Sequence, residues 1–425
     1  MASIRPFSGL RFNVDAGPID KLTAPPYDVL SSEEREEYAS RNPHNVVHLT
    51  IPEQKPDDRS KYIKYARSAA LLTAWRQDGT LKLEPKPAIY RYTQHFSLPE
   101  IPNAFSRTSI IALIKVEPYE AGVVLPHEQT FPKHREDRLR ILEATRAHLE
   151  CIFGLYEDPN GEILKAILQA PASEVVHAHS DEGVDHELEP ITDEAANANL
   201  IGLLTQKKVW IADGHHRYET ALAFRQNIGP RDEVVPEDFM MMALTSISDP
   251  GLVLLPTHRI VRSMVPPMDQ ALSELAEVFN LEAMPAKQLM SRIKQFHRKG
   301  IRAFGAAFAG GLGYVLTEKH KGSVLALNMS EESDSLKDLD VTVLHRVILE
   351  KLLNVAGLDH ISYTRDAGEA VCAVEDGAAV SFLMNAPSVE DMQKIALGGE
   401  KMPQKSTYYY PKILSGLVIW SLNDF

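Results

Sequence analysis

The sequence has little cysteine, no long apolar segment and no surplus of positive charge. Cys151 and Cys372 are its only cysteines, and no Cys-x-x-Cys spacing occurs. This excludes a disulfide framework and a cysteine zinc site, and it favours a reducing compartment. No run approaches the roughly 18 apolar residues of a membrane-spanning helix. The first residues, "MASIRPFSGLRFN", lack the apolar core of a signal peptide.

The charge balance is acidic, with 45 Lys and Arg against 58 Asp and Glu and a net charge of −13. Broad binding to nucleic acid or to an anionic membrane needs a basic surface, so neither partner is expected. The 44% hydrophobic and 24% charged residues are ordinary for a globular protein. Composition therefore predicts a cytoplasmic globular protein and leaves its oligomeric state open.

A chain of 425 residues is long for a single core and predicts two domains or one domain with a large elaboration. The "VPPM" segment favours a boundary near residue 262, which gives regions 1–262 and 263–425. The end of the second region is apolar, so we expect this tail to pack back on the body.

Local patterns predict the main elements. Ser31 or Ser32 is an expected helix N-cap. Apolar spacing predicts helices at 60–77, 135–149, 268–280, 285–299, 338–355 and 388–397. "AIYRYTQHFSL" and "RTSIIALIKVEPY" are expected to form a strand pair, with further strands in "CIFGLYED" and at 301–317 and 378–386. Residues 173–195 are acidic and are expected to be an exposed stretch.

"KKVWIADGHHRYETALAFRQ", residues 207–226, joins an apolar strand to a helix through charged residues. Gly214 allows a sharp turn, and apolar helical spacing begins at Tyr218. A helix start presents backbone N–H groups that suit phosphate, and Arg217 adds a permanent charge. The alternative is a capped surface helix with polar decoration.

"LPHEQTFPKHRED", residues 125–137, places a carboxylate in a turn before a helix. Glu128 is a candidate general base if a substrate proton lies within reach. The alternative is an acid that caps the following helix. His134, Arg135, Arg138 and Arg140 fit a solvated charged face of that helix.

"KMPQKSTYYYPK", residues 401–412, offers Lys405, Ser406 and Thr407 as phosphate-binding groups. The glycine spacing of a P-loop is absent. The Tyr408–Tyr410 run fits either base stacking or an edge strand.

No zinc-binding spacing occurs, and His215 and His216 are neighbours that point different ways, so no metal site built from protein side chains is expected. Mg²⁺ carried in by nucleotide phosphates, touching Asp213 or Glu128, is the more plausible metal. In "APPYDVL", Asp28 either reaches the pocket or belongs to a rigid turn.

Four segments, "APPYDVL", "IFGLYED", "ADGHHRYETAL" and "MPQKSTYYYPKILSGLVIW", resemble a widespread bacterial and archaeal family of uncharacterised function. The match covers nearly the whole chain. Its core resembles the ParB/sulfiredoxin-like superfamily, in which a strand–turn–helix grips nucleotide phosphates. The resemblance implies an α+β fold, a ParB/sulfiredoxin-like core with an N-terminal region and a C-terminal α/β region.

Within that superfamily, the order of motifs is most similar to free L-serine kinase. The resemblance implies that Glu128 is the base, with Asp213 as a second catalytic residue and His127 and Asp28 as further candidates. Gly214, His215, His216 and Arg217 would hold the donor phosphates, and Lys405, Ser406 and Thr407 would complete the pocket. ATP or ADP with Mg²⁺ is the implied cofactor. This chain is longer and has Gln-Lys-Ser-Thr where the kinase pattern is closer to Pro-Lys-Thr-Thr. Sulfiredoxin chemistry is not expected, because His215 stands where that motif has cysteine.

The implied function is nucleotide-dependent phosphorylation of a small hydroxyl-bearing metabolite, most plausibly free L-serine, by an enzyme of the phosphotransferase class. The alternative is a regulatory protein that binds or hydrolyses nucleotide without a small-molecule acceptor. A ParB-like DNA-binding function would require a basic surface patch.

Overall fold

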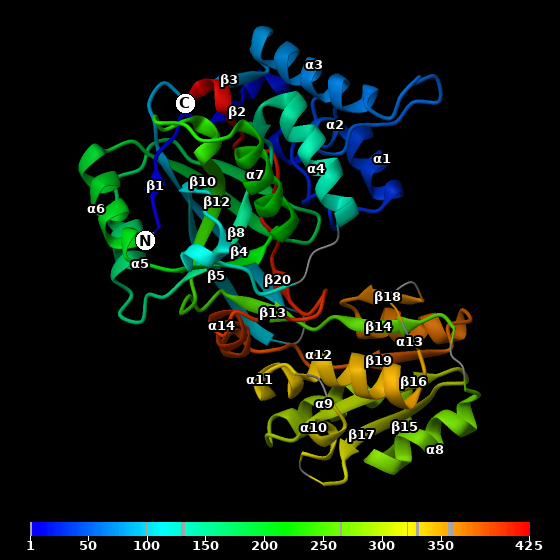
Figure 1. Ribbon diagram of the computed structural model, residues 1–425. Helices are drawn as coiled ribbons and strands as arrows, with labels where there is room; N and C mark the ends of the chain where they lie inside the picture. The colour runs from blue at the N-terminus through cyan, green and yellow to red at the C-terminus, as the bar shows by residue number, and fades with distance from the viewer. Residues whose placement is uncertain are drawn as a thin grey trace. The chain divides into compact units, whose positions relative to one another are not determined.

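The computed structural model describes residues 2–98, 101–128, 132–263, 266–320, 322–328, 331–355, 357 and 360–425. This part of the chain is mixed α/β and forms two compact units (Figure 1). Unit 1 comprises Met1–Pro126, Thr130–Val253 and Pro411–Phe425, and unit 2 comprises His127–Gln129 and Leu254–Tyr410. The domain division expected at residue 262 remains a prediction. Among the described helices, none has the length and apolar content to cross a membrane.

Unit 1 is built on a large mixed sheet with the strand order β6-β11-β8-β12-β5-β4-β10-β9, and β1 pairs with β5. Its strands are β1 Ile4–Arg5, β4 Ile89–Leu98, β5 Ile101–Lys115, β6 Val124–Leu125, β8 Ile152–Tyr156, β9 Val176–His179, β10 Asp185–Ile191, β11 Val209–Asp213 and β12 Phe239–Ser246. The β11–β6 and β12–β8 pairs are parallel and the others antiparallel. All of β8 and β12 is buried, as expected for central strands covered on both faces.

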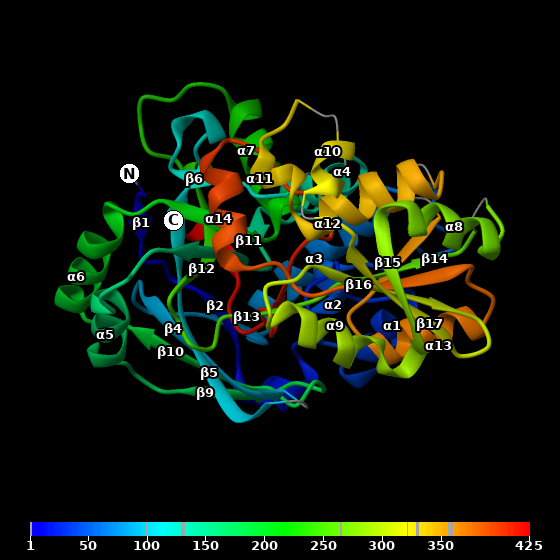
Figure 2. The ribbon, with the colours of Figure 1, turned by 90° about the horizontal axis from the view of Figure 1, so that it is seen from below.

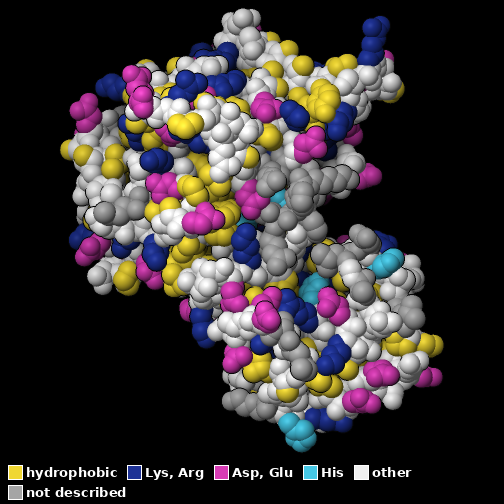
Figure 3. All heavy atoms as spheres, viewed as in Figure 1, with side chains coloured by type: hydrophobic (Ala, Val, Ile, Leu, Met, Phe, Trp, Pro, Cys, Tyr) yellow, Lys and Arg dark blue, Asp and Glu magenta, His cyan; other side chains and the backbone are white. Residues whose placement is uncertain are grey.

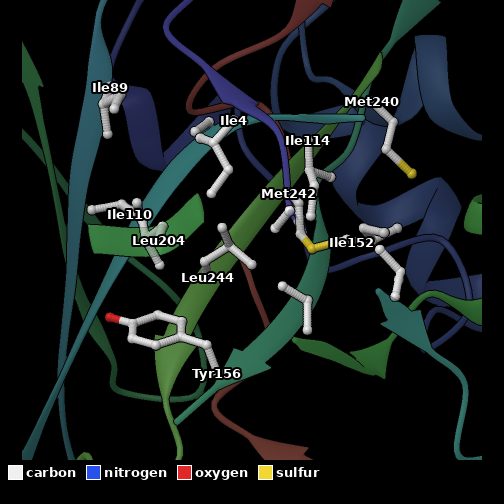
Figure 4. Packing of buried hydrophobic residues seen from close by; sticks show 14 of the residues in the cluster. Ile4, Ile89, Ile110, Ile114, Ile152, Tyr156, Leu204, Met240, Met242 and Leu244 are labelled. Atoms are coloured by element: carbon white, nitrogen blue, oxygen red, sulfur yellow. The ribbon is translucent and has the colours of Figure 1, made fainter. Parts of the chain in front are cut away.

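Helices lie on both sides of this sheet. They are α1 Ser32–Arg41, α2 Val47–Thr50, α3 Ile63–Gln77, α4 Pro132–Thr145, α5 Glu162–Gln169, α6 Glu194–Thr205 and α7 His215–Ile228. Figures 1 and 2 both show α5 and α6 side by side. Their apolar residues belong to the buried cluster of Figure 4, which includes Ile110, Met242 and Leu244 of the sheet and Leu204 of α6. A second core links α1–α4 to Leu10, Leu81 and Ile419.

The polypeptide from Pro411 to Phe425 is part of unit 1. Its strand β21 Trp420–Ser421 pairs with β7 Ala147–His148, and Ile419 exchanges backbone hydrogen bonds with Leu10 of β2 Leu10–Phe12. Strand β2 also pairs with β3 Leu81–Leu83. The final residues therefore hold the N-terminal segment against the body of unit 1.

Unit 2 contains an antiparallel sheet with the order β15-β17-β16-β19-β14-β18. The strands are β14 His258–Val261, β15 Phe279–Pro285, β16 Ala303–Phe308, β17 Leu312–Glu318, β18 Ile361–Thr364 and β19 Val380–Leu383. Its helices are α8 Met268–Val278, α9 Leu289–His297, α10 Ser323–Leu327, α11 Asp334–Lys337, α12 Asp340–Thr342, a π-helical segment Val343–Leu352, α13 Ala367–Glu375 and α14 Val389–Leu397. Residues of α9 and α13 pack with the sheet in one apolar core. Two short strands, β13 Val253–Leu255 and β20 Tyr408–Tyr410, form a separate two-stranded sheet.

Most local expectations are confirmed. Ser31 caps α1 and forms a capping box with Glu34. Strands β4 and β5 pair as expected, and the strand expected at 301–317 is a hairpin of β16 and β17.

The expectation of an exposed stretch at residues 173–195 holds only in part, because exposed residues alternate there with buried ones. This stretch contains the paired strands β9 and β10, and β10 pairs with β4. In β10 the buried His186 and Leu188 alternate with the more exposed Asp185 and Glu187. The acidic composition obscured this period of two, which is the pattern of a half-buried strand.

Gly154 in β8 lies where the core leaves no room for a side chain. A Cβ atom there would lie 2.5 Å from Met242 Sδ and 2.9 Å from Val209 Cγ1. Overpacking of a buried site should make Gly154→Ala less stable by about 1–3 kcal/mol. Gly202 in α6 is exposed and has open space, so Gly202→Ala should stabilise by about 0.5–1 kcal/mol. Urea denaturation of both variants measures the difference, and a Gly154→Ala protein as stable as the parent would contradict this packing.

Candidate functional site

The turn between β11 and α7 has a special backbone. The pairing of β11 with β8 shifts register between Ile211 and Asp213, so the strand ends in an irregularity. Gly214 follows in the left-handed region, with φ 91° and ψ 28°. A Cβ atom at this position would lie 2.6 Å from Ile152 Cγ2, so both conformation and space require glycine.

Helix α7 begins at His215, directly after the glycine, so Arg217 lies in its first turn as expected. His215, His216 and Arg217 therefore form its first turn, and the Tyr218 amide donates to Gly214 O at 3.0 Å. His215 is buried and His216 partly buried. Backbone amides of a first helical turn lack a carbonyl one turn earlier, which makes this geometry suited to an anion.

Asp213 is held between two cations. Lys412 Nζ lies 3.0 Å from Asp213 Oδ1, and Arg217 Nη2 lies 3.3 Å from Oδ2. Burial disfavours the charged carboxyl, but the charges of Lys412 and Arg217 outweigh it and lower the pKa of Asp213 to about 2. Asp213 is thus an ionised carboxylate at neutral pH and a poor proton acceptor.

The Arg217 side chain lies close to Gly214 of the turn. Its side chain is 9% exposed, and Nη1 donates to Cys151 O at 2.6 Å. Burial disfavours the cation, yet Glu150, Asp28 and Asp213 together hold the pKa of Arg217 above its usual value. The buried Nε makes no hydrogen bond to any of the described residues.

The "APPYDVL" turn lies beside Arg217. The Tyr27 ring faces two guanidinium groups, with Arg138 at 4.0 Å and Arg217 at 5.7 Å from its centroid. The Tyr27 amide donates to Glu150 Oε1 at 2.9 Å. Asp28 is exposed and contributes to the field at Arg217.

The expectation of a solvated face is wrong for Arg138. This side chain is buried, and its Nη1 donates to Thr50 O at 2.8 Å. The side chains of His134 and Arg135 lie outside the described residues. Arg138, Glu150 and Arg217 help line a cavity of about 50 Å³.

Cys151 borders the same region, because its carbonyl accepts the hydrogen bond from Arg217. Its thiol is buried, and burial raises the pKa of Cys151 to about 12. Among the described residues, no group of three or more His, Cys, Asp or Glu side chains is arranged to hold a metal ion.

Glu128 lies in unit 2 against the turn at residues 403–407, which is part of the 401–412 segment. Its Oε1 accepts the Ser406 amide at 2.6 Å and the Thr407 amide at 3.4 Å. His127 Nε2 lies 2.9 Å from Thr407 Oγ1, and the Met402 amide donates to His127 O at 2.7 Å. This carboxyl oxygen therefore binds the 403–407 turn.

The 403–407 turn has a strained residue at its centre. Lys405 is exposed and left-handed, with φ 56°. This conformation precedes the two amides that converge on Glu128, an arrangement typical of anion-binding turns. The buried Ser406 hydroxyl donates to Pro403 O.

A buried arginine supports this turn. Arg259 is fully buried, and its Nη2 donates to Lys405 O at 3.0 Å. Its Nε donates to His345 Nε2 at 3.1 Å. Burial lowers the pKa of Arg259 to about 10, although the charge of Glu128 opposes that shift. Burial also lowers the pKa of His345 to about 3, so His345 is neutral and can accept this bond.

The candidate residues thus fall into two groups. In unit 1, Asp213 to Arg217 form one turn, with Asp28 nearby; in unit 2, His127 and Glu128 lie against Lys405–Thr407. Lys412 and Arg259 were not among the sequence candidates. The "YPK" that ends the 401–412 segment is a usable signal for Lys412, whereas nothing in its local sequence distinguishes Arg259.

Surface charge bears on the DNA-binding alternative. On the faces of the two units drawn in Figure 3, described side chains of both signs are interspersed, without a continuous basic area. Contact with a phosphate backbone would need a basic area, whereas these faces carry charges of both signs.

The lowered pKa of Asp213 makes the free energy of unfolding depend on pH. Because the folded-state pKa lies below the unfolded value of 3.8, the stabilisation is present above about pH 4 and disappears as pH falls towards 2. Asp213→Asn should therefore lose stability by about 1–2 kcal/mol more at pH 6 than at pH 2.5. Urea denaturation at both pH values measures this difference, and an equal loss at both would contradict the ion network.

Similar solved structures include a conserved hypothetical protein from Pyrococcus furiosus, with 14% identity, TM-score 0.36, and 74% of this chain and 96% of the other covered. A variant of a free serine kinase in complex with ADP has 13% identity, TM-score 0.36, and 74% and 92% coverage. SbnI from Staphylococcus aureus, truncated at its C-terminus, has 12% identity, TM-score 0.34, and 72% and 86% coverage. No curated protein matches the sequence.

One family model, described as "Protein of unknown function (DUF1015)", matches residues 4–342. This match includes the β11–α7 turn and Glu128, but it stops before the 403–407 turn and Lys412. It covers most of the sequence, and the chain belongs to the DUF1015 family of proteins of unknown function.

Proposed function

We propose that this protein is a nucleotide-dependent kinase that phosphorylates the hydroxyl group of a small metabolite, free L-serine. The observation that carries the proposal is the β11–Gly214–α7 turn, where a helix start, Arg217 and Lys412 surround one carboxylate. Phosphoryl transfer depends mainly on positioning and on charge neutralisation. The sequence resemblance to free L-serine kinase supports the choice of acceptor.

The proposal assigns the donor nucleotide, ATP or ADP, to the unit 1 turn. The backbone at Gly214, His215 and His216 and the side chain of Arg217 would hold its terminal phosphates. Because the pKa of Asp213 is about 2, its carboxylate acts as a fixed charge that orients Lys412 and Arg217.

The acceptor chemistry is assigned to Glu128. Its carboxylate takes the proton from the serine hydroxyl while that oxygen forms a bond to the terminal phosphorus, and the bond to the bridging oxygen of the nucleotide breaks. The Ser406 and Thr407 amides fix one carboxyl oxygen and so orient the base. His127 and Lys405 are assigned to this acceptor side.

Mg²⁺ is part of the proposal as an ion carried by the nucleotide. Because the described residues build no three-ligand metal cluster, its ligands would be mainly phosphate oxygens and water, with Asp213 as a protein contact. When bound, the ion neutralises charge on the phosphates. We further propose a ParB/sulfiredoxin-like core in unit 1 and a cytoplasmic location.

Replacing Glu128 tests the base. Glu128→Gln should lower the rate of phosphoserine formation by about 10²–10⁴-fold and leave nucleotide affinity nearly unchanged, because only proton acceptance is lost. Phosphorus NMR with Mg²⁺, L-serine and either ATP or ADP measures both the product and the donor.

The matched control is Glu375→Gln. Glu375 also lies in unit 2 and also accepts two backbone amides, from Gly310 at 3.2 Å and Gly311 at 2.9 Å. It should retain full activity. Phosphoserine formation by Glu128→Gln at the rate of the parent protein would rule out the assigned base. Nucleotide consumption by the parent protein without a new phosphoester would favour the regulatory alternative.

Replacing Arg217 tests the donor site. Arg217→Lys keeps the charge but loses the forked donor, so nucleotide affinity should fall by at least about tenfold. Arg225→Lys, at the other end of α7 and paired with Asp238, is the control and should bind normally. Isothermal titration calorimetry measures both, and unchanged affinity in Arg217→Lys would refute a phosphate contact.

A further inference from the structure

The backbone around Lys412 is fixed by buried side chains of the unit 1 sheet. Gln94 Nε2 donates to Lys412 O at 2.9 Å, and Arg107 donates to Pro411 O. Two residues further on, the Leu414 amide donates to Tyr92 Oη at 3.2 Å. Each of these supports lies on β4 or β5 and is separated from the tail by hundreds of residues.

The side chains that support this segment are buried polar and charged groups, and burying them costs free energy. Arg107 and Gln94 are both fully buried, and Arg107 Nε donates to Gln94 Oε1 at 3.1 Å. Burial lowers the pKa of Arg107 to about 10. Since a buried cation costs free energy, its retention beneath one short segment calls for a reason.

The supported segment presents one cation to the β11–α7 turn. The Lys412 side chain is only 11% exposed, and its ammonium lies 3.0 Å from Asp213. Asp213 already contacts Arg217, so the carboxylate has a cation from its own helix. The buried Arg217 Nε, which has no acceptor among the described residues, is an independent sign that this turn binds an anion.

We propose that Lys412 is a phosphate-binding residue whose ammonium is shared between Asp213 and a nucleotide phosphate, and that Gln94 and Arg107 position it. This inference rests on the proposed function, which assigns nucleotide to the same turn. Lys412 differs from Arg217 in coming from the opposite end of the chain, so tail docking completes the site. An ammonium group supplies three rotatable donors and can serve a carboxylate and a phosphate together.

Lys412→Met tests the phosphate contact by calorimetry with ATP, ADP, AMP and adenosine. The loss of affinity should be about tenfold or more for ATP and ADP, smaller for AMP and absent for adenosine. Lys64→Met is the control, because Lys64 forms an ion pair of similar length, 2.9 Å, with Asp137 elsewhere in unit 1. It should bind all four ligands normally.

Equal losses for ATP and adenosine would show that Lys412 is only structural and would overturn the inference. If the parent protein binds none of these ligands, the proposed nucleotide site fails, and inorganic pyrophosphate becomes the probe. Weaker pyrophosphate binding by Lys412→Met would support the Lys412 assignment. Equal binding by both proteins, or no binding by either, would overturn it.

Gln94→Glu tests the positioning role. It keeps an acceptor for Arg107 but replaces the donor to Lys412 O by a carboxylate, which should displace Lys412. The same phosphate-dependent loss should appear, and Gln94→Glu should add nothing in the Lys412→Met background. Additive losses would overturn the positioning role. Thermal unfolding of each variant checks that the fold persists.

Discussion

The fully buried guanidinium of Arg107 is the constraint on which much of unit 1 depends. A cation without water must find acceptors, and β5 cannot supply them from its own ladder. Gln94 on the neighbouring strand and the Pro411 carbonyl supply them instead. The last segment of the chain must therefore cross this sheet, and in doing so it pairs with Leu10 and His148 and brings Lys412 to Asp213.

The β11–α7 turn shows how charge is organised around one backbone feature. Gly214 allows the turn, and its missing side chain leaves room for Ile152 and for the Arg217 side chain beneath. The carboxylates Asp213 and Glu150 keep Arg217 charged despite burial, whereas the thiol of Cys151 stays protonated in the same surroundings. Preorganised charge of this kind favours binding and stabilising an anion over acid–base chemistry at Asp213.

In unit 2 a buried arginine likewise holds a turn that orients a charged side chain. Arg259, also buried and with a lowered pKa, binds the carbonyl of the left-handed Lys405. The two amides that follow then meet on Glu128. In both units a buried arginine secures a short segment by its backbone, and the segment in turn fixes a charged side chain proposed to act on substrate. Burying each cation costs free energy, which is consistent with a functional role for the segment that it holds.

The sequence by itself determined the local elements and the turn chemistry. The capping box at Ser31, the Gly214 turn and the strand-to-helix change at residues 209–228 follow from residue type and spacing. Spacing could not give the burial of Arg138, the hairpin hidden under acidic residues at 176–191, or the roles of Lys412 and Arg259. The burial of Arg138 and the roles of Lys412 and Arg259 depend on partners more than 80 positions away, such as Thr50 for Arg138 and Asp213 for Lys412. Only tertiary packing decides which charged side chains are buried away from water. Burial in turn decides which of them are fixed in position.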